Sequence, residues 1–172
     1  TRSKKIKTFT SYSRVKTMRA GILLLGPLVA KFKKAECSLP GGCLIGPVRP
    51  VNFHLQALCK LGMKYNIKKG YIYAGVEKKL KGNLIKFPKI SVGATENLII
   101  AATQAKGITI LSNCAIEPEI KDLTNFLNNA GAKIKWSGKR TCLIEGVQSL
   151  RKIKYSIMGD RIEAGTFCIA AA

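Results

Sequence analysis

The sequence predicts an α/β (α+β) fold built from a repeated unit, and the order of the predicted elements carries that prediction. A polar, charged opening runs into an apolar helix three times, at residues 16–25, 93–102 and 159–170. After the first two, a short β segment, a loop, a helix with proline near its start and two short strands follow in the same order. The glycines that end the two proline-started helices, Gly62 and Gly131, lie 69 residues apart. A repeat of about 70 residues is too long for a solenoid module and indicates two copies of one α/β unit, with a third starting near Asp160.

The two proline-started helices are predicted over residues 50–61 and 118–130. Proline suits the first helical position because its missing N–H would be unpaired there in any case. Glycine suits the position that follows the last turn, and apolar residues recur along both segments at helical spacing. Polar turns that contain glycine separate the paired strands. The predicted strands cover residues 35–39, 63–67 and 71–74 in the first copy and 108–111, 132–136 and 141–145 in the second.

Length and composition indicate a globular chain with a sizeable core. The chain has 172 residues, 47% of them apolar, which is enough for one domain and part of another. It begins at Thr1 and ends in an apolar run, residues 167–172, so we expect both ends to be cut from a longer protein. The apolar stretch at residues 20–30 follows a basic segment, as in a signal peptide, but it is too short to span a bilayer and it recurs deep in the chain. No membrane span is predicted.

The net charge of +21 is typical of a protein that binds nucleic acid. Two features count against that interpretation: the lysines are scattered, and the aromatic residues, 7% of the chain, do not alternate with them as a stacking surface would need. A positive field also suits a substrate that carries a diphosphate or a phosphate and a carboxylate. We therefore expect no nucleic-acid partner, and a basic nucleic-acid-binding module stays as an alternative.

The cysteines do not predict a metal site. No pair of the six has C-x-x-C spacing, and His54 is the only histidine. Their irregular spacing favours reduced thiols in a cytosolic protein over a disulfide framework. We expect neither a metal nor a cofactor.

One loop, residues 38–50, has the composition of a reactive site. It holds three glycines, three prolines, Cys43 and Arg49. Glycine and proline at this density predict an ordered loop between regular elements. A thiol six residues before an arginine, at the start of a helix, suggests chemistry on an anionic substrate. The plain alternative is an inert cysteine in a buried loop.

The same loop, LPGGC-x-I-G followed by RPV, resembles the reactive-cysteine loop of the UDP-N-acetylglucosamine enolpyruvyl transferases. The resemblance extends from about Tyr12 to Ala172. It implies an inside-out α/β barrel of the enolpyruvyl transferase type, with repeated βαβαββ units around buried helices at 20–30, 98–105 and 164–172. It further implies that residues 1–158 form most of the cysteine-loop domain, as repeats 15–83 and 84–158, and that residues 159–172 begin a second, truncated domain.

The resemblance also assigns roles to residues. Cys43 would be the general acid toward phosphoenolpyruvate and the target of fosfomycin, in the cytoplasmic synthesis of peptidoglycan precursors. Three runs that match the family would bind the substrates phosphoenolpyruvate and UDP-N-acetylglucosamine. They supply Arg19 in TMRA, Arg49, Pro50, Val51, Asn52 and Phe53 in RPVNF, and Lys89, Ile90, Ser91 and Val92 in KISV.

Two departures from the family pattern affect the nucleotide-binding run. Arg49 follows Cys43 by six residues where the family usually has five, and Asn52 replaces the family's aspartate. The extra residue would displace Arg49 or be absorbed as a bulge, and the lost carboxylate would weaken uridine recognition.

Several structural alternatives stay open beside these roles. Arg19 could form an ion pair at a helix start, His54 could serve packing, and Glu117 and Glu119 could favour the dipole of the helix that they begin. The related shikimate-pathway synthase shares the architecture but lacks the cysteine loop. A catalytically inactive remnant that only binds UDP-sugar is the other alternative, and the sequence leaves the oligomeric state open.

Overall fold

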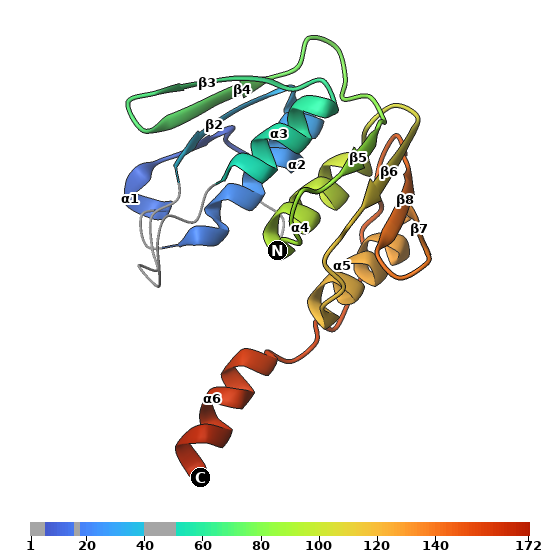
Figure 1. The fold of residues 1–172 in the computed structure, drawn as a ribbon. Helices are drawn as coiled ribbons and strands as arrows, with labels where there is room; N and C mark the ends of the chain where they lie inside the picture. The colour runs from blue at the N-terminus through green and yellow to red at the C-terminus, as the bar shows by residue number, and fades with distance from the viewer. Residues whose placement is uncertain (1–5, 16–17, 40–50) are drawn as a thin grey trace.

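The computed structural model describes residues 6–15, 18–39 and 51–172, which form two α/β halves and a projecting helix (Figure 1). The first half contains strands β1 (Phe9–Thr10), β2 (Lys34–Ser38), β3 (Lys64–Lys68) and β4 (Tyr71–Gly75), and helices α1 (Tyr12–Val15), η1 (Arg19–Leu24, a 3-10 helix), α2 (Leu25–Phe32) and α3 (Asn52–Lys60). The second half contains strands β5 (Leu84–Lys86), β6 (Ile108–Ser112), β7 (Lys133–Ser137) and β8 (Thr141–Glu145), and helices α4 (Val92–Ala102) and α5 (Pro118–Asn129). Helix α6 (Arg161–Ala171) follows at the carboxyl end.

The two halves have the same sheet topology, which confirms the predicted repeat. Their strand orders are β1-β2-β4-β3 and β5-β6-β8-β7. In each sheet the first pair is parallel and the other two are antiparallel. Among the described residues the two sheets are separate and open, so they do not form the closed barrel that the predicted fold class includes.

The ends of α3 and α5 show how closely the repeat is copied at the backbone. Gly62 and Gly131 follow the two helices with φ of 97° and 98°. The residue after each glycine donates its backbone N–H to a carbonyl in the last turn of the helix. Met63 donates to the Leu58 carbonyl over 3.2 Å, and Ala132 donates to the Leu127 carbonyl over 2.9 Å. This is the Schellman arrangement, which uses glycine because other residues rarely adopt a positive φ. The predicted helix ends and the hairpins after them are confirmed.

Two short strands and one helix type differ from the sequence expectation. β1 and β5 are two and three residues long and were not predicted. Residues 19–24 form a 3-10 helix, in which Gly21 lies against Val15 so closely that an added Cβ would meet the valine at 2.8 Å. The tight contact explains why this turn is occupied by a glycine and why α1 packs on it.

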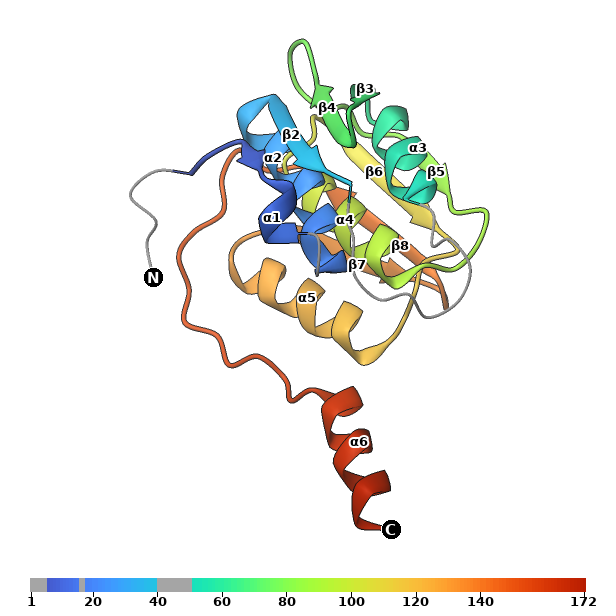
Figure 2. The ribbon, with the colours of Figure 1, turned by 90° about the vertical axis from the view of Figure 1, so that its left-hand side faces the viewer.

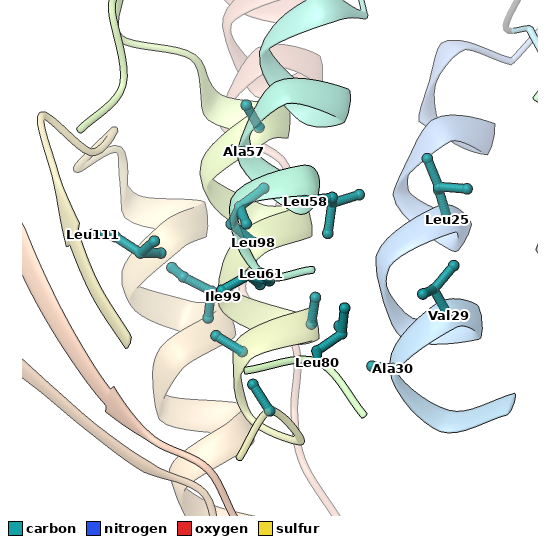
Figure 3. Close-up of a cluster of buried hydrophobic side chains, with 14 of the residues drawn as sticks. Leu25, Val29, Ala30, Ala57, Leu58, Leu61, Leu80, Leu98, Ile99 and Leu111 are labelled. Carbon is teal, nitrogen blue, oxygen red and sulfur yellow. The ribbon is translucent and has the colours of Figure 1, made fainter. Parts of the chain in front are cut away.

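The core lies between the helices of both halves. Buried side chains of α2, α3 and α4 meet there, with contributions from Leu80 and from Leu111 of β6 (Figure 3). Helix α4 is buried around most of its circumference, which confirms that the apolar segment 98–105 belongs to an inner helix. α2 approaches α4 closely at Gly26, where any side chain would overlap with Asn97. The close approach brings the amino-terminal turns of these helices together at one end of the core.

Helix α6 projects away from both halves (Figures 1 and 2). None of its residues is buried, and Ile162, Phe167 and Ile169 are at least 63% exposed, so the helix predicted to be buried at residues 164–172 is exposed in this structure. Asp160 caps it by accepting hydrogen bonds from the amides of Ile162 and Glu163. Within the described ranges, no helix has the length and apolar character needed to cross a membrane.

Candidate anion-binding site

The described residues of the candidate site lie at the amino-terminal turns of η1, α3 and α4. In Figure 1 these turns are at the lower ends of the three helices. Arg19 begins η1 and is half-buried. His54 of α3 lies against Gly93 of α4, because a Cβ on that glycine would be 3.3 Å from the imidazole Cε1. The same Cβ would be 3.9 Å from a methyl of Leu23 in η1. Residues far apart in the sequence therefore meet at one place.

The predicted site residues fall into two groups. Cys43, Arg49 and Pro50 lie outside the described residues. The others lie at the three helix starts: Arg19 on η1, Val51, Asn52 and Phe53 at the start of α3, and Lys89, Ile90, Ser91 and Val92 at the start of α4.

The start of α3 is left open by its own sequence. Val51 occupies the capping position and has an apolar side chain, so it cannot accept a hydrogen bond from the first turn. Asn52 is exposed, Phe53 is half-buried, and the first turn contains no acidic residue. Among the described residues no side chain caps this helix start, so the positive end of the helix dipole favours an anion there.

The start of α4 has a side-chain cap, and an exposed lysine precedes it. Ser91 caps the helix by accepting a hydrogen bond from the Ala94 amide over 3.3 Å. Lys89, Ile90 and Val92 around it are exposed, and the first turn has no acidic residue. Lys89 thus presents its charge to solvent immediately before a positive helix end.

His54 itself is buried, with 5% of its surface exposed. Burial, and then the positive charge of Arg19, lower its pKa from 6.5 to about 4. The imidazole is therefore neutral at pH 7. The positive charge of this region comes from arginine, lysine and helix dipoles rather than from the histidine.

Asn97 of α4 was missed by the sequence analysis as a member of this region. It is fully buried and bonded to three other segments. Its Oδ1 accepts a hydrogen bond from the Gly26 amide over 2.9 Å, and its Nδ2 donates to the Ile22 carbonyl over 3.0 Å and lies 3.1 Å from His54 Nδ1. The only sequence signal for it is a polar residue on an apolar helix, which is too common to identify a role.

The carboxylates at the start of α5 serve the helix and its neighbours. Glu117 accepts a hydrogen bond from the Ile116 amide over 2.8 Å, and Glu119 lies 2.7 Å from Arg161 of α6. Glu119 also raises the pKa of Glu96 by repulsion, although burial of Glu96 is the larger cause. A hydrogen bond with its own backbone in the first turn is the largest cause that lowers the pKa of Glu119, which fits the helix-start interpretation. Glu117 makes no side-chain capping bond to α5.

Cysteines and other clusters offer no second site in the described part of the chain. The five described cysteines are free thiols, and burial raises the pKa of Cys114 and of Cys142 to about 12. Such thiols stay protonated and unreactive at neutral pH. No group of three or more histidine, cysteine, aspartate or glutamate side chains could hold a metal ion within the described ranges.

The family model that matches this chain and two of its curated relatives are carboxyvinyltransferases by name. A family model described as EPSP synthase (3-phosphoshikimate 1-carboxyvinyltransferase) matches residues 1–172. The chain is 68% identical over 170 residues to the UDP-N-acetylglucosamine 1-carboxyvinyltransferase of Pelagibacter ubique, covering 99% of this chain and 40% of that protein. It is 54% identical to the protein of the same name from Coxiella burnetii, covering 94% of this chain and 37% of that protein. The chain thus spans about two fifths of the length of the curated relatives that it matches.

Solved structures share the fold. The enolpyruvyl transferase NikO from Streptomyces tendae superposes with a TM-score of 0.71 at 22% identity, over 86% of this chain and 35% of that one. EPSP synthase from Acinetobacter baumannii superposes with a TM-score of 0.60 at 18% identity, over 77% of this chain and 29% of that one. The predicted enolpyruvyl transferase type of fold is confirmed.

Proposed function

Because the chain belongs to the EPSP synthase family, we propose that it forms part of a UDP-N-acetylglucosamine 1-carboxyvinyltransferase. That enzyme would move the enolpyruvyl group of phosphoenolpyruvate to the 3′-hydroxyl of UDP-N-acetylglucosamine and release phosphate, in the cytoplasmic synthesis of peptidoglycan precursors. The observation that carries the proposal is the 68% identity with the Pelagibacter ubique protein, whose name gives this reaction.

The three helix starts supply the binding chemistry that this reaction needs. Both substrates carry phosphate groups, and helix amino termini with neighbouring arginine and lysine are suited to phosphate. In this proposal Arg19, the open turn at Val51–Phe53 and the run Lys89–Val92 hold the anionic groups. The neutral His54 packs against Gly93 at the start of α4 and adds no charge to the site.

Cys43 carries the proton transfer in this proposal. Its thiol gives a proton to the methylene carbon of phosphoenolpyruvate, and the sugar hydroxyl loses its own proton as its oxygen adds to the enol carbon. The new methyl group then loses a proton as phosphate leaves, which restores the double bond of the enolpyruvyl group. A general acid works best when its pKa lies near the working pH. Arg19 and Arg49 would favour the thiolate and bring the pKa of Cys43 toward that range.

The domain assignment follows the same proposal. Residues 1–158 would be most of the cysteine-loop domain, with repeats at 15–83 and 84–158, and residues 159–172 would begin the next domain. The exposed apolar side chains of α6 support this assignment, because an inner helix needs a domain around it.

Release of inorganic phosphate tests the proposed function. The chain and a longer product of the same gene are each incubated with phosphoenolpyruvate and UDP-N-acetylglucosamine. We expect phosphate release that requires both substrates from the longer product, and binding of UDP-N-acetylglucosamine by the chain in calorimetry. A longer product that releases no phosphate, together with salt-dependent retention of the chain on DNA, would favour the nucleic-acid alternative instead.

A further inference from the structure

The carboxamide of Asn97 can be oriented in only one way. The Gly26 amide can only donate, so the atom facing it is the oxygen Oδ1. The Ile22 carbonyl can only accept, so the atom facing it is the nitrogen Nδ2. Two backbone groups from η1 and α2 therefore fix the amide without reference to the histidine.

The fixed amide determines the tautomer of His54. Asn97 Nδ2 carries two hydrogens, and one of them points to the imidazole Nδ1 at 3.1 Å. Nδ1 must therefore accept, and the hydrogen of the neutral ring must be on Nε2. A protonated ring would set two N–H groups against each other, so the network also excludes the imidazolium form.

The same four groups join η1, α2, α3 and α4. Ile22 and Gly26 belong to η1 and α2, His54 to the first turn of α3, and Asn97 to α4. The His54 ring in turn lies against Gly93 in the first turn of α4. A buried, hydrogen-bonded group of this kind favours a single arrangement of the elements that it joins.

We propose that Asn97 is a positioning residue of the anion site: its carboxamide holds His54 in the Nε2–H tautomer and thereby sets where the first turns of η1, α3 and α4 lie. Asn97 touches no ligand in this proposal and acts through His54 and the backbone of η1 and α2. The inference takes its ligand from the proposed function, whereas its structural consequence can be measured without any ligand.

The variant Asn97→Asp tests this directly. The carboxylate can still accept from Gly26, but it cannot donate to Ile22 or to His54, and it favours a protonated imidazole instead. Asn128→Asp is the matched control, because Asn128 also bonds a backbone amide and carbonyl, those of Ile134, away from these helix starts. His54 is the only histidine, so its ring signals in an NMR spectrum need no separation from others.

Without ligand, we expect the ring nitrogens of His54 to show the Nε2–H tautomer in the wild-type chain and in Asn128→Asp. In Asn97→Asp we expect its pKa to rise and the amide signals of Arg19, Phe53 and Gly93 to move. A wild-type ring with its hydrogen on Nδ1, or helix-start amides that stay in place in Asn97→Asp, would overturn the inference.

With UDP-N-acetylglucosamine, we expect Asn97→Asp to bind about tenfold more weakly than Asn128→Asp, because the displaced helix starts no longer face the ligand as they do in the wild-type chain. Equal affinities of the two variants would overturn the inference. A wild-type chain that binds no UDP-N-acetylglucosamine would contradict the proposed function, and the ligand-free measurements would then decide the inference by themselves.

A second pair of variants decides the matter if Asn97→Asp does not fold. His54→Gln keeps an acceptor for Asn97 Nδ2, whereas His54→Leu leaves one of the two hydrogens on that nitrogen buried without a partner. We expect His54→Gln to leave the amide signals of Arg19 and Gly93 near their wild-type positions and His54→Leu to move them. The same displacement in both variants would show that the hydrogen bond from Asn97 is not what positions the site.

Discussion

Helices α3 and α5 occupy the same place in the two repeats, and their carboxyl ends are almost identical while their amino ends have opposite chemistry. Both end in a glycine with φ near 97° and the same backbone hydrogen bond. α3 begins after Val51 with no acidic residue in its first turn, whereas α5 begins after Glu117 and carries Glu119 there. The two repeats thus share a backbone scaffold, and the side chains of the first turn make the start of α5 acidic and that of α3 free of acidic residues.

Replacing Cys43 should have the largest effect, because this thiol belongs to the first repeat alone. We expect Cys43→Ser to lower turnover of the longer gene product by about 100- to 10,000-fold, the usual contribution of a general acid. It should also abolish labelling by fosfomycin, which mass spectrometry detects. Cys114→Ser is the control in the second repeat, and undiminished labelling of Cys43→Ser would remove the thiol from the mechanism.

Removing the charge at the start of η1 should have the next largest effect. We expect Arg19→Ala to weaken binding of UDP-N-acetylglucosamine by about tenfold to hundredfold, the range for a charge-assisted hydrogen bond. The pKa of His54 should rise as well, since the charge of Arg19 is one cause of its low value. Calorimetry and NMR titration measure the two effects. Arg161→Ala removes a comparable charge from the start of α6 and should change neither.

Acidification should destabilise the first repeat through His54. Its pKa is about 4 in the folded chain against 6.5 for the free side chain, so the unfolded chain binds the proton first as the pH falls. The stabilising contribution is complete above pH 6.5 and is lost on the way down to pH 4, about 2 kcal/mol of it between pH 7 and pH 5. Urea unfolding at the two pH values measures this loss. In His54→Gln the loss should be smaller by that amount, and an identical loss would contradict the neutral, buried imidazole.

The shared helix ends should respond alike in the two repeats. We expect Gly62→Ala and Gly131→Ala each to lower the free energy of unfolding by about 1 kcal/mol, because alanine is strained at positive φ. Neither should alter the affinity for UDP-N-acetylglucosamine by more than the error of calorimetry. A clear loss of affinity in Gly62→Ala alone would mean that the end of α3, and not only its start, belongs to the site.

The smallest effect is expected at the acidic start of α5. Glu119 and Arg161 form an exposed ion pair, and such pairs contribute little to stability in water. Glu119→Gln should leave the urea midpoint and the affinity for UDP-N-acetylglucosamine unchanged. A tighter complex in this variant would show that the carboxylate repels the ligand and that α5 lies near it.

The sequence predicted the repeated elements well because their signals are local. The strand pairs after Gly62 and Gly131 and the helices before them are specified by prolines, glycines and apolar spacing within about twenty residues. β1 and β5 escaped prediction because each is held by a parallel partner more than twenty residues away, Phe9 by Glu36 and Leu84 by Ile110. The 3-10 geometry of η1 depends on the contact between Gly21 and Val15, which no local pattern reveals.

Only the parts of the candidate site that lie in short sequence motifs could be predicted from the sequence. The runs at Arg19, Val51–Phe53 and Lys89–Val92 could be identified one by one, and the structure brings them to one end of the core. The bond between Gly26 and Asn97 joins residues 71 positions apart, and neither residue is unusual in its own surroundings. A buried polar contact of this kind follows from the packing of α2 on α4, which only the folded chain defines.

Backbone amide shifts on addition of UDP-N-acetylglucosamine test most directly whether the open helix starts of the first repeat and of α4 bind the ligand. The account predicts the largest shifts at Arg19, Phe53 and Gly93, with the amides of Glu119 and Ala130 unchanged. Shifts centred on the start of α5, or none at these three residues when the ligand is bound, would contradict it.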